Sequence, residues 1–385
     1  MKLAFVIFKF FPYGGLQLDF RRILEECIRR GHEITVYTRQ WDGPLPECAN
    51  VKIIAVSGFS NHAKALSFEK KVLYILNNDQ PDLIVGFNRM AGLDVYFAAD
   101  NCFATESEAT AGLKRLFTAR YRVYRKMEQT VFSVDSDTTI MYLTQRQKND
   151  FINVYGTQPE RFHLLPPGIE EKRKPPENQE QIASIRNTIR AEFKTTADEF
   201  LLIQVCSGFE TKGVDRTLRL IASLPTEIPV KLIIAGRDNS RRFIKLSRKL
   251  NISERVVFTG GRDDIGNLLL GADLMIHPAR KECTGTVLIE ALTAGLPIIC
   301  SQICGYENIV AQAGGIVMPE PFELISWNKV IIELLLNMKK LQNIGQKARD
   351  YSVNADFYRR AEVATDIIEN SVKDKLNNRH NLNMK

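Results

Sequence analysis

Residues 3–8, Leu-Ala-Phe-Val-Ile-Phe, form a short apolar run, and the turn-forming sequence Pro12-Tyr13-Gly14-Gly15 follows it. Residues 16–30 then have a helical pattern, and residues 33–37 are rich in β-forming side chains. A buried strand, a glycine turn, a helix and a second strand, in this order, begin a doubly wound α/β domain. A lysine interrupts the first apolar run and no small-x-small cleavage site follows, so a buried strand explains this run better than a signal peptide.

The same alternation continues along the chain. In the first half, helical patterns separate buried strands predicted at residues 51–56, 83–87 and 138–144. Residues 164–169 break the pattern, and a polar stretch runs to about residue 181, which indicates an interdomain connection. A second α/β half follows, with strands predicted at 200–205, 230–235, 256–259, 274–277, 297–301 and 315–318. Two such domains create a cleft at the carboxyl ends of their sheets, which is the usual ligand site.

Composition narrows the class of protein. A chain of 385 residues suggests two domains, and 44% hydrophobic with 25% charged residues excludes a mostly disordered or coiled-coil chain. No uncharged apolar run approaches the ~18 residues that a membrane span needs. The net charge of +7 favours an anionic partner without choosing among nucleotide, nucleic acid and acidic membrane. Seven cysteines without a CxxC pair, and histidines without ligand spacing, favour reduced thiols and no zinc site.

The most informative stretch is residues 282–297. Thr284 suits a helix N-cap, Gly285 lets a ligand approach the backbone, and the helix is expected to end at Gly295. The free N–H groups at such a helix start form a natural diphosphate site. Glu282 and Glu290 would flank it, about 10 Å apart by helix rise. A sugar nucleotide has this elongated shape, although a capped helix with one exposed and one half-buried glutamate is the plain alternative.

Two further segments support a phosphate ligand. Lys212, beside Gly213 after a predicted strand, could reach a phosphate as a point charge, or it could be a solvated lysine before a helix. Gly14 and Gly15 could place backbone N–H groups against a phosphate and an acceptor, or they could form a simple tight turn. This turn is not GxGxxG, which disfavours a nicotinamide or flavin site.

Together these residues resemble the retaining GT-B glycosyltransferases of family 4, whose hallmark is two glutamates at the spacing of Glu282 and Glu290, with a lysine at the place of Lys212. Residues 10–20, 85–100, 165–169 and 212–216 look, in order, like segments of the members that act on the lipopolysaccharide core. The resemblance implies an α/β GT-B fold, with two Rossmann-like doubly wound domains facing across a cleft. One departure is the missing second basic residue before the lysine, where Ser207, Glu210 and Thr211 stand.

The resemblance also implies a domain plan. Residues 1–165 would form the acceptor-binding domain, which includes a basic membrane-facing segment at 103–132. Residues 166–355 would bind the nucleotide sugar. Residues 356–385 would contain a C-terminal helix at 357–375 that crosses back to the N-terminal domain, followed by a polar tail that we expect to be disordered.

The resemblance assigns roles by position. Glu282 would contact the donor hexose, Glu290 the ribose, and Lys212 the leaving diphosphate. Asp100 would lie by the hexose or acceptor, and Gly15 would meet the β-phosphate side, with Asp19 nearby. The expected catalytic residues are therefore Glu282, Lys212, Asp100 and Asp19. The expected substrate-binding residues are Gly14, Gly15, Arg173, Arg262 (on a loop covering the uracil), Cys283, Thr284, Gly285, Thr286 and Glu290.

The implied reaction moves glucose from UDP-glucose to an inner-core heptose of lipopolysaccharide, in an α-1,3 linkage with retention. It would occur in a Gram-negative bacterium, at the cytoplasmic face of the inner membrane. No Asp-x-Asp metal cage follows a strand, so we expect no metal and no cofactor, with Lys212 and the helix start stabilising the leaving group. A front-face route needs no enzymatic base, whereas Asp100 as nucleophile is the alternative. The other functions left open are transfer of another UDP-hexose or to another glycan, and a membrane-associated sugar-nucleotide binder with little activity.

Residues 113–127 carry six basic side chains and no acid, with apolar residues at the spacing of one helix face. A basic amphipathic helix with aromatics is typical of a protein that lies peripherally on an anionic membrane. A surface helix that packs on its own domain is the alternative, and no nucleic-acid motif is present. The expected membrane contacts are Lys114, Arg115, Phe117, Arg120, Arg122, Arg125 and Lys126.

Overall fold

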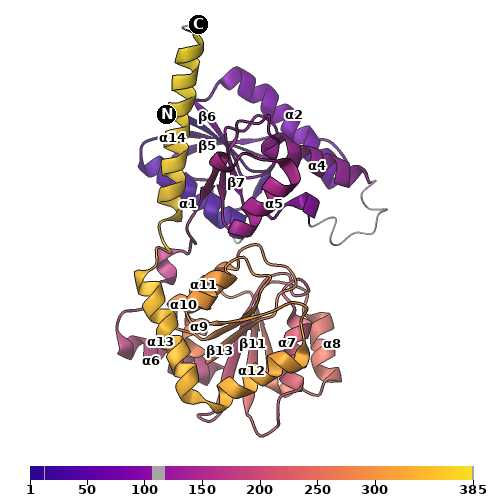
Figure 1. Cartoon of the computed structure of the whole chain (residues 1–385), viewed down its shortest axis with the longest axis vertical. Helices are drawn as coiled ribbons and strands as arrows, with labels where there is room; N and C mark the ends of the chain where they lie inside the picture. Colours follow the sequence, from indigo (N-terminus) through magenta and orange to yellow (C-terminus); the bar gives the residue numbers. More distant parts are fainter. Residues whose placement is uncertain (13, 106–117, 384–385) are drawn as a thin grey trace. The chain divides into compact units, whose positions relative to one another are not determined.

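The computed structural model describes residues 1–12, 14–105 and 118–383, and it divides into two compact units (Figure 1). Unit 1 comprises Met1–Gly168 and Arg359–Lys385, and unit 2 comprises Ile169–Tyr358. These borders differ by three residues from the sequence-based ones at 165/166 and 355/356. Each unit is an α/β layered structure around a parallel sheet, so the predicted fold class is confirmed.

Unit 1 contains a seven-stranded parallel sheet in the order β5-β3-β1-β6-β7-β8-β9. The first strand lies inside the sheet, between β3 and β6, and its residues 3–6 are apolar and buried, because both faces of a parallel sheet are covered by helices. The strands are β1 (Lys2–Val6), β3 (Glu33–Thr38), β5 (Ala49–Ile53), β6 (Leu83–Gly86), β7 (Val95–Ala98), β8 (Thr139–Tyr142) and β9 (Phe162–Leu164), with β2 (Lys9–Phe10) and β4 (Gln40–Trp41) paired separately.

Helices cover both faces of this sheet. They are α1 (Gly15–Arg29), α2 (Asn61–Asp79), α4 (Ala119–Phe132), α5 (Gln145–Tyr155) and α14 (Arg360–Asn383), with a 3-10 turn at Pro159–Arg161. The C-terminal helix α14 lies along α1 in unit 1 (Figure 1), and its Ile368 packs in one core cluster with Phe20 and Ile23 of α1. We predicted a disordered tail after residue 375, but α14 continues to Asn383, so this prediction is wrong for residues 376–383. A helix that has already formed gains one hydrogen bond for each residue that extends it.

Unit 2 contains a six-stranded parallel sheet in the order β12-β11-β10-β13-β14-β15. All six predicted strands are confirmed, because each is a short, mostly apolar run bounded by turn residues. The strands are β10 (Phe200–Val205), β11 (Val230–Ala235), β12 (Val256–Gly260), β13 (Leu274–His277), β14 (Ile298–Ser301) and β15 (Ile316–Met318). The helices are α6 (Gln179–Glu192), α7 (Val214–Ala222), α8 (Arg241–Lys249), α9 (Ile265–Gly271), α10 (Thr286–Thr293), α11 (Glu307–Gln312), α12 (Leu324–Leu336) and α13 (Met338–Asn354), with 3-10 turns at Glu171–Arg173 and Ser253–Arg255.

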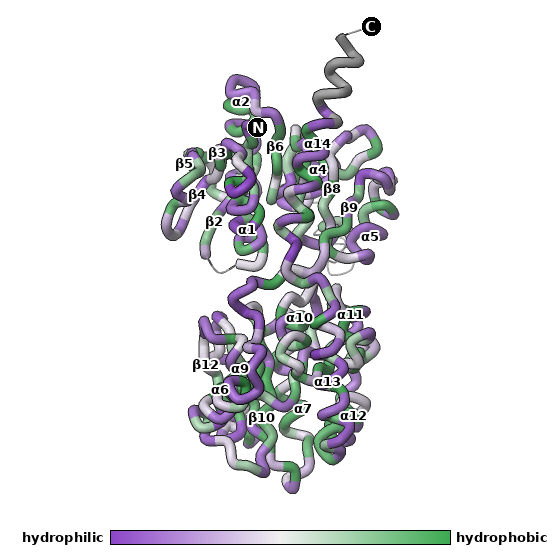
Figure 2. Tube along the Cα trace, turned by 90° about the vertical axis from the view of Figure 1, so that its left-hand side faces the viewer, coloured by the Kyte–Doolittle hydropathy of each residue, from purple (hydrophilic) through white to green (hydrophobic). Residues whose placement is uncertain are grey.

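Both sheets are buried between two apolar layers, one on each face. Figure 2 shows this pattern as hydrophobic colour inside each unit and hydrophilic colour along outer helices. Among the described residues, no helix combines the length and the apolar composition needed to cross a membrane.

Candidate functional site

The lysine singled out from the sequence is held by a loop at the carboxyl end of β10. This loop is fixed to the chain that follows β13, because the carbonyl oxygen of Thr211 accepts from the backbone N–H groups of Arg280 (2.8 Å) and Lys281 (3.1 Å). Gly213 caps α7 with φ +71°, and a Cβ there would lie 2.1 Å from the carbonyl oxygen of Pro278. Only glycine permits this approach, which brings Lys212 against the residues after β13.

Lys212 and Glu282, both half-buried, form a cluster with the buried His277. Lys212 Nζ lies 2.8 Å from Glu282 Oε2, and His277 Nε2 lies 3.2 Å from the same oxygen. The side chain of Glu282 is 12% exposed and that of His277 only 1%. Burial alone would raise the pKa of Glu282, but the hydrogen bond from His277 and the charge of Lys212 outweigh it and lower this pKa to about 2. The carboxylate is therefore charged at neutral pH.

The cluster keeps hydrogen-bonding capacity for a ligand. Lys212 Nζ also donates to the carbonyl oxygen of Lys281 at 3.1 Å, so two of its three donors are used by the described residues. Both contacts of Glu282 are made at Oε2, and Oε1 accepts no hydrogen bond within the described ranges. One carboxylate oxygen and one ammonium donor thus remain for substrate groups.

The helix that follows begins one residue later than predicted. Gly285, not Thr284, is the N-cap of α10, with φ +87° and no side-chain hydrogen bond to the helix start. The carbonyl oxygen of Thr284 instead accepts from the N–H of Tyr306 at 2.9 Å. The prediction of Thr284 as N-cap is wrong, because Gly285 reaches the left-handed conformation that a threonine rarely adopts. Thr286 is the first helical residue, so the first backbone N–H groups of α10 have no intrahelical acceptor.

The second glutamate lies on the same helix and contacts Arg173. Arg173 NH1 is 2.8 Å from both oxygens of Glu290, and its Nε is 3.4 Å from Glu170. Glu290 and Arg173 line a cavity of about 260 Å³ within unit 2, together with Asp263 and Asp264. The sequence did not predict this contact, because Arg173 lies 117 residues before Glu290.

Arg262 lies at the edge of the same region. Its guanidinium makes paired hydrogen bonds to Asp264 (2.8 and 2.7 Å) and contacts Glu192 at 2.6 and 3.1 Å. These bonds raise the pKa of Arg262 and fix its side chain against α6 and the start of α9. That the loop of Arg262 covers the uracil of the donor stays a prediction. The structure shows that the carboxylates of Asp264 and Glu192 hold the guanidinium of Arg262.

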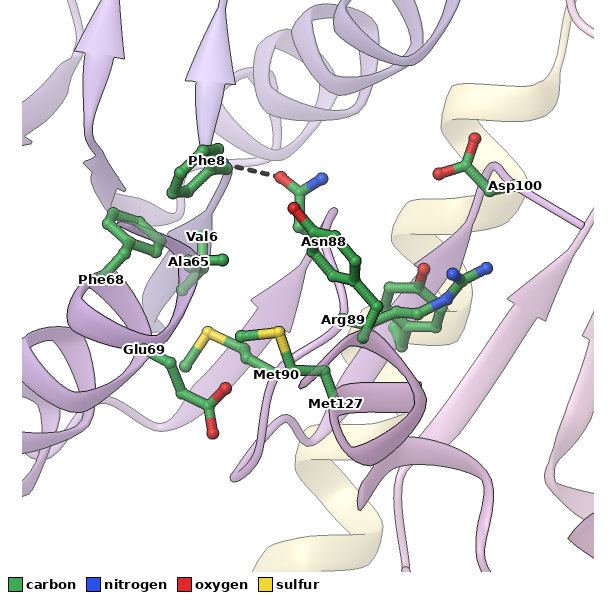
Figure 3. A pocket seen from close by; sticks show the side chains of 12 residues that line it. Val6, Phe8, Ala65, Phe68, Glu69, Asn88, Arg89, Met90, Asp100 and Met127 are labelled. Carbon is green, nitrogen blue, oxygen red and sulfur yellow. Dashed lines mark hydrogen bonds between the residues drawn. The ribbon is translucent and has the colours of Figure 1, made fainter. Parts of the chain in front are cut away.

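In unit 1, Asp100 follows β7 and is exposed at the rim of a cavity (Figure 3). Its loop is fixed by Gln147, whose Nε2 donates to the carbonyl oxygens of Ala98 (3.0 Å) and Asp100 (3.1 Å). Gly14 is the N-cap of α1 and Gly15 its first residue, and a Cβ at Gly15 would meet no described atom within 4 Å. The space beside Gly15 is therefore open, whereas a Cβ at Gly14 would lie 1.9 Å from Gln17 Oε1.

Asp19 has a different environment from the one expected of a catalytic group. Its Oδ2 is 2.8 Å from Arg360 NH1 and its Oδ1 is 3.5 Å from Arg22 NH1. The side chain of Arg360 is only 3% exposed, and its Nε donates to the carbonyl oxygen of Pro166 at 2.8 Å. Asp19 thus takes part in an ion pair that anchors the start of α14.

Within the basic segment 113–127, the structure describes residues from Thr118 onward, and Thr118 is the N-cap of α4. Lys114, Arg115 and Phe117 therefore lie outside the described residues. Arg120, Arg122 and Lys126 are exposed on α4. Arg125 is half-buried, with its guanidinium 4.3 Å from the ring centre of Tyr155. The carboxyl end of α4 is the anchored part, where Met127, Glu128, Val131 and Phe132 are buried.

Comparison with known proteins identifies the family. The model of "Glycosyl transferases group 1" matches residues 185–351, and that of "Glycosyltransferase Family 4" matches residues 13–173. The lipopolysaccharide glucosyltransferase WaaG of Escherichia coli K12 is 40% identical over 371 residues, which cover 96% of this chain and 98% of that protein. This chain belongs to the WaaG family of glycosyltransferases.

Solved structures agree with this assignment. The crystal structure of WaaG matches with a TM-score of 0.89 and 40% identity, over 95% of this chain and 99% of the other. Anabaena HepE in complex with UDP and glucose matches with a TM-score of 0.71 over 96% and 99% of the two chains, and at 18% identity it shows the fold alone. The GT-B fold expected from the resemblance is thereby confirmed.

In this member of the WaaG family, sequence analysis missed the contribution of His277. The histidines were considered only as metal ligands, and their spacing excluded that role. The available signal was the position of His277 at the carboxyl end of an apolar strand, five residues before Glu282. A buried ionisable residue at such a strand end is often close to a ligand site. Its Nδ1 is buried and has no hydrogen-bond partner in the part of the chain that the structure describes.

Proposed function

We propose that this glycosyltransferase moves glucose from UDP-glucose to an inner-core heptose of lipopolysaccharide, in an α-1,3 linkage with retention. The observation that carries the proposal is the half-buried contact of Lys212 with Glu282, just before the start of α10. The WaaG relative is a lipopolysaccharide glucosyltransferase, and 40% identity over nearly the whole chain supports the same donor sugar and acceptor class.

Unit 2 would bind the donor. The diphosphate would accept hydrogen bonds from the remaining N–H of Lys212 and from the backbone N–H groups of Gly285 and Thr286. These two backbone groups lie at the start of α10, which is the positive end of the helix dipole. The backbone around Cys283 and Thr284 would border the same group. This arrangement supplies positive charge without a second basic residue before Lys212.

The two glutamates would then bind the two ends of the donor. Glu282 Oε1 would accept hydrogen bonds from hexose hydroxyls, while Oε2 stays with Lys212 and His277. Glu290 would accept the ribose hydroxyls, and Arg173 would hold its carboxylate charged and oriented. Arg262 would border the uracil from its fixed position beside Asp264.

The chemical step would follow a front-face route. The bond between the anomeric carbon and the β-phosphate oxygen breaks, and UDP leaves with the electron pair. The heptose hydroxyl oxygen bonds to the same face of that carbon, and its proton moves to the departing phosphate oxygen. Lys212 and the α10 N–H groups stabilise the charge that develops on UDP, which requires neither a metal ion nor an enzymatic base.

Unit 1 would bind the acceptor, with Gly14 and Gly15 at the start of α1, where the space beside Gly15 is open, and Asp100 at the rim of its cavity. The buried pair of Asp19 and Arg360 supports a structural role for Asp19 in place of the catalytic one expected from the sequence. The exposed cations of α4 would hold the protein peripherally at the inner leaflet of the inner membrane, where a lipid-linked acceptor lies.

The test is transfer of radiolabelled sugar to core lipid that lacks the outer glucose, with UDP-glucose, UDP-galactose and UDP-N-acetylglucosamine compared, in the presence and absence of EDTA. We expect UDP-glucose to be preferred, EDTA to have no effect, and the product to contain an α-1,3-linked glucose by NMR. Transfer only from another UDP-hexose, or only to another glycan, would replace the proposal with a related activity. Uridine binding without any turnover would favour a sugar-nucleotide binder.

A further inference from the structure

Unit 1 contains a cavity of about 220 Å³ that the donor site does not use. It lies at the carboxyl ends of β1 and β6 and is closed on its sides by α2 and α4. Figure 3 shows the side chains around it. We call it the α2–α4 pocket, and its lining comprises Val6, Phe8, Ala65, Phe68, Glu69, Asn88, Arg89, Met90, Tyr96, Asp100, Tyr124 and Met127.

The pocket has an apolar wall. Phe8 and Phe68 meet edge to face with ring centres 5.3 Å apart, and Met90 and Met127 are buried beside them. Aromatic and methionine side chains of this kind pack against C–H groups without demanding hydrogen bonds. The wall therefore suits the apolar face of a ring.

The pocket also contains polar atoms whose hydrogen bonds are not satisfied by the protein. Glu69 Oε2 and Arg89 Nε are buried and have no hydrogen-bond partner within the described part of the chain. Such atoms are rare in folded proteins, and two of them in one cavity indicate a missing ligand or ordered water. Asn88 Oδ1 accepts from the N–H of Phe8 at 2.7 Å, which leaves its amide NH₂ group as a donor (Figure 3).

Arg89 is held rigidly in this wall. Its NH2 donates to the carbonyl oxygen of Asn101 at 2.7 Å and lies 3.3 Å from Glu128, which is fully buried. Glu128 in turn accepts from the backbone N–H groups of Phe103 (2.7 Å) and Ala104 (3.1 Å). The guanidinium is thus fixed through Nη2, while Nε has no hydrogen-bond partner among the described residues.

We propose that the α2–α4 pocket binds a neutral sugar ring of the acceptor, with Glu69 and Asp100 accepting its hydroxyls, Arg89 and Asn88 donating to its oxygens, and Phe8, Phe68 and the methionines against its C–H face. This inference rests on the proposed function and names the place where its acceptor binds. A sugar ring combines donors, acceptors and an apolar face, and the pocket offers all three.

Other ligand classes fit the pocket less well. A phosphate or the donor diphosphate would meet two carboxylates, Glu69 and Asp100, and be repelled. An acyl chain would leave Glu69 Oε2 and Arg89 Nε without a hydrogen-bond partner in an apolar setting. Tyr124 and Met127 of the wall belong to α4, the helix that presents Arg120 and Arg122 to solvent. A lipid-linked sugar would therefore find its binding pocket on the same helix as its membrane contact.

The first test uses methionine-methyl NMR of the full chain titrated with deacylated inner-core oligosaccharide that lacks the outer glucose. We expect the methyl signals of Met90 and Met127 to shift with saturation, and that of Met318 in unit 2 to stay in place. The second test measures the KM for the acceptor in Glu69→Gln, an isosteric change that removes only the charge. We expect at least a tenfold increase in this KM, with the Kd for UDP within twofold of the wild-type value. Glu47→Gln, at an exposed position of unit 1, is the matched control and should change neither value.

The outcomes separate this inference from the proposed function. A wild-type chain that transfers glucose, with an unchanged acceptor KM in Glu69→Gln and no shift at Met90 or Met127, would overturn the pocket assignment alone. A wild-type chain that transfers no glucose, but whose Met90 and Met127 signals shift with the oligosaccharide, would overturn the proposed donor and keep the pocket. No transfer and no shift would overturn both. If Glu69→Gln fails to fold by circular dichroism, the NMR titration of the wild-type chain still decides.

Discussion

Replacing Glu282 with glutamine tests its cluster with Lys212 and His277 most quantitatively, because it removes the charge and keeps the shape of the side chain. His277 and Lys212 lower the pKa of this carboxyl from 4.5 to about 2. Each unit by which a pKa changes corresponds to about 1.36 kcal/mol, so the cluster favours the charged form of Glu282 over the neutral form by about 3 kcal/mol. Glutamine resembles the neutral form, so Glu282→Gln should lower the free energy of unfolding at pH 7 by about 3 kcal/mol.

The contribution of Glu282 to the free energy of unfolding should depend on pH. The folded-state pKa of Glu282 lies below its unfolded value, so its contribution to stability is complete above pH 4.5 and is lost as the pH falls through about 2. At pH 3 the difference between the wild type and Glu282→Gln should therefore shrink to roughly half, about 1.4 kcal/mol. We also expect turnover to fall at least roughly tenfold, because the neutral amide loses its charge-assisted bond to Lys212.

The assay is urea unfolding at pH 7 and pH 3, followed by circular dichroism, together with steady-state transfer from UDP-glucose. Glu47→Gln serves as the control, since this glutamate is exposed. A variant as stable as the wild type at pH 7, or a difference that does not shrink on acidification, would refute the view that Lys212 and His277 hold a charged Glu282.

Three further changes test other parts of the site. Lys212→Gln should lower kcat/KM about a hundredfold, because it removes the positive side chain that would face the developing charge on UDP. Arg360→Gln should lower the free energy of unfolding by about 3–5 kcal/mol, since Asp19 would stay buried with only the longer 3.5 Å contact to Arg22; hydrogen exchange should show α14 loosened. Changing Arg120 and Arg122 of α4 together to glutamine should weaken binding to anionic vesicles by about 2 kcal/mol, roughly thirtyfold, by co-sedimentation.

Two of these changes have a matched control, and each of the three has an outcome that would contradict it. Lys339→Gln, an exposed lysine of unit 2, should leave transfer unchanged, and equal activity in Lys212→Gln would remove the lysine from the mechanism. Full stability in Arg360→Gln would show that apolar packing alone holds α14. Changing the exposed Arg241 and Lys245 of α8 should not affect vesicle binding. The same weakening in that pair would indicate a general charge effect in place of a specific surface.

Sequence reasoning worked where the signal was local. The strands of unit 2 are mostly apolar runs. Only a few residues separate Lys212 from the preceding strand and Glu282 from the following helix, so both positions follow from the local sequence. The interdomain border was found within three residues because composition changes there. Short strands were harder, as β7 (Val95–Ala98) shows, because four apolar residues do not distinguish a strand from a helix segment.

Contacts between distant segments could not be predicted. Asp19 and Arg360 are 341 residues apart, so nothing near Asp19 revealed that a buried arginine holds it. Arg173 and Glu290 are 117 residues apart, and only the folded unit brings them together. The α2–α4 pocket was missed for the same reason, since its wall is assembled from several elements of unit 1.

The most direct measurement is a crystal structure of this chain soaked with UDP-glucose. We expect the diphosphate within hydrogen-bonding distance of Lys212 Nζ and the first N–H groups of α10, with the glucose hydroxyls on Glu282 and the ribose on Glu290. Density for the nucleotide at any other surface, or a donor whose phosphates lie away from Lys212 and Gly285, would contradict the account.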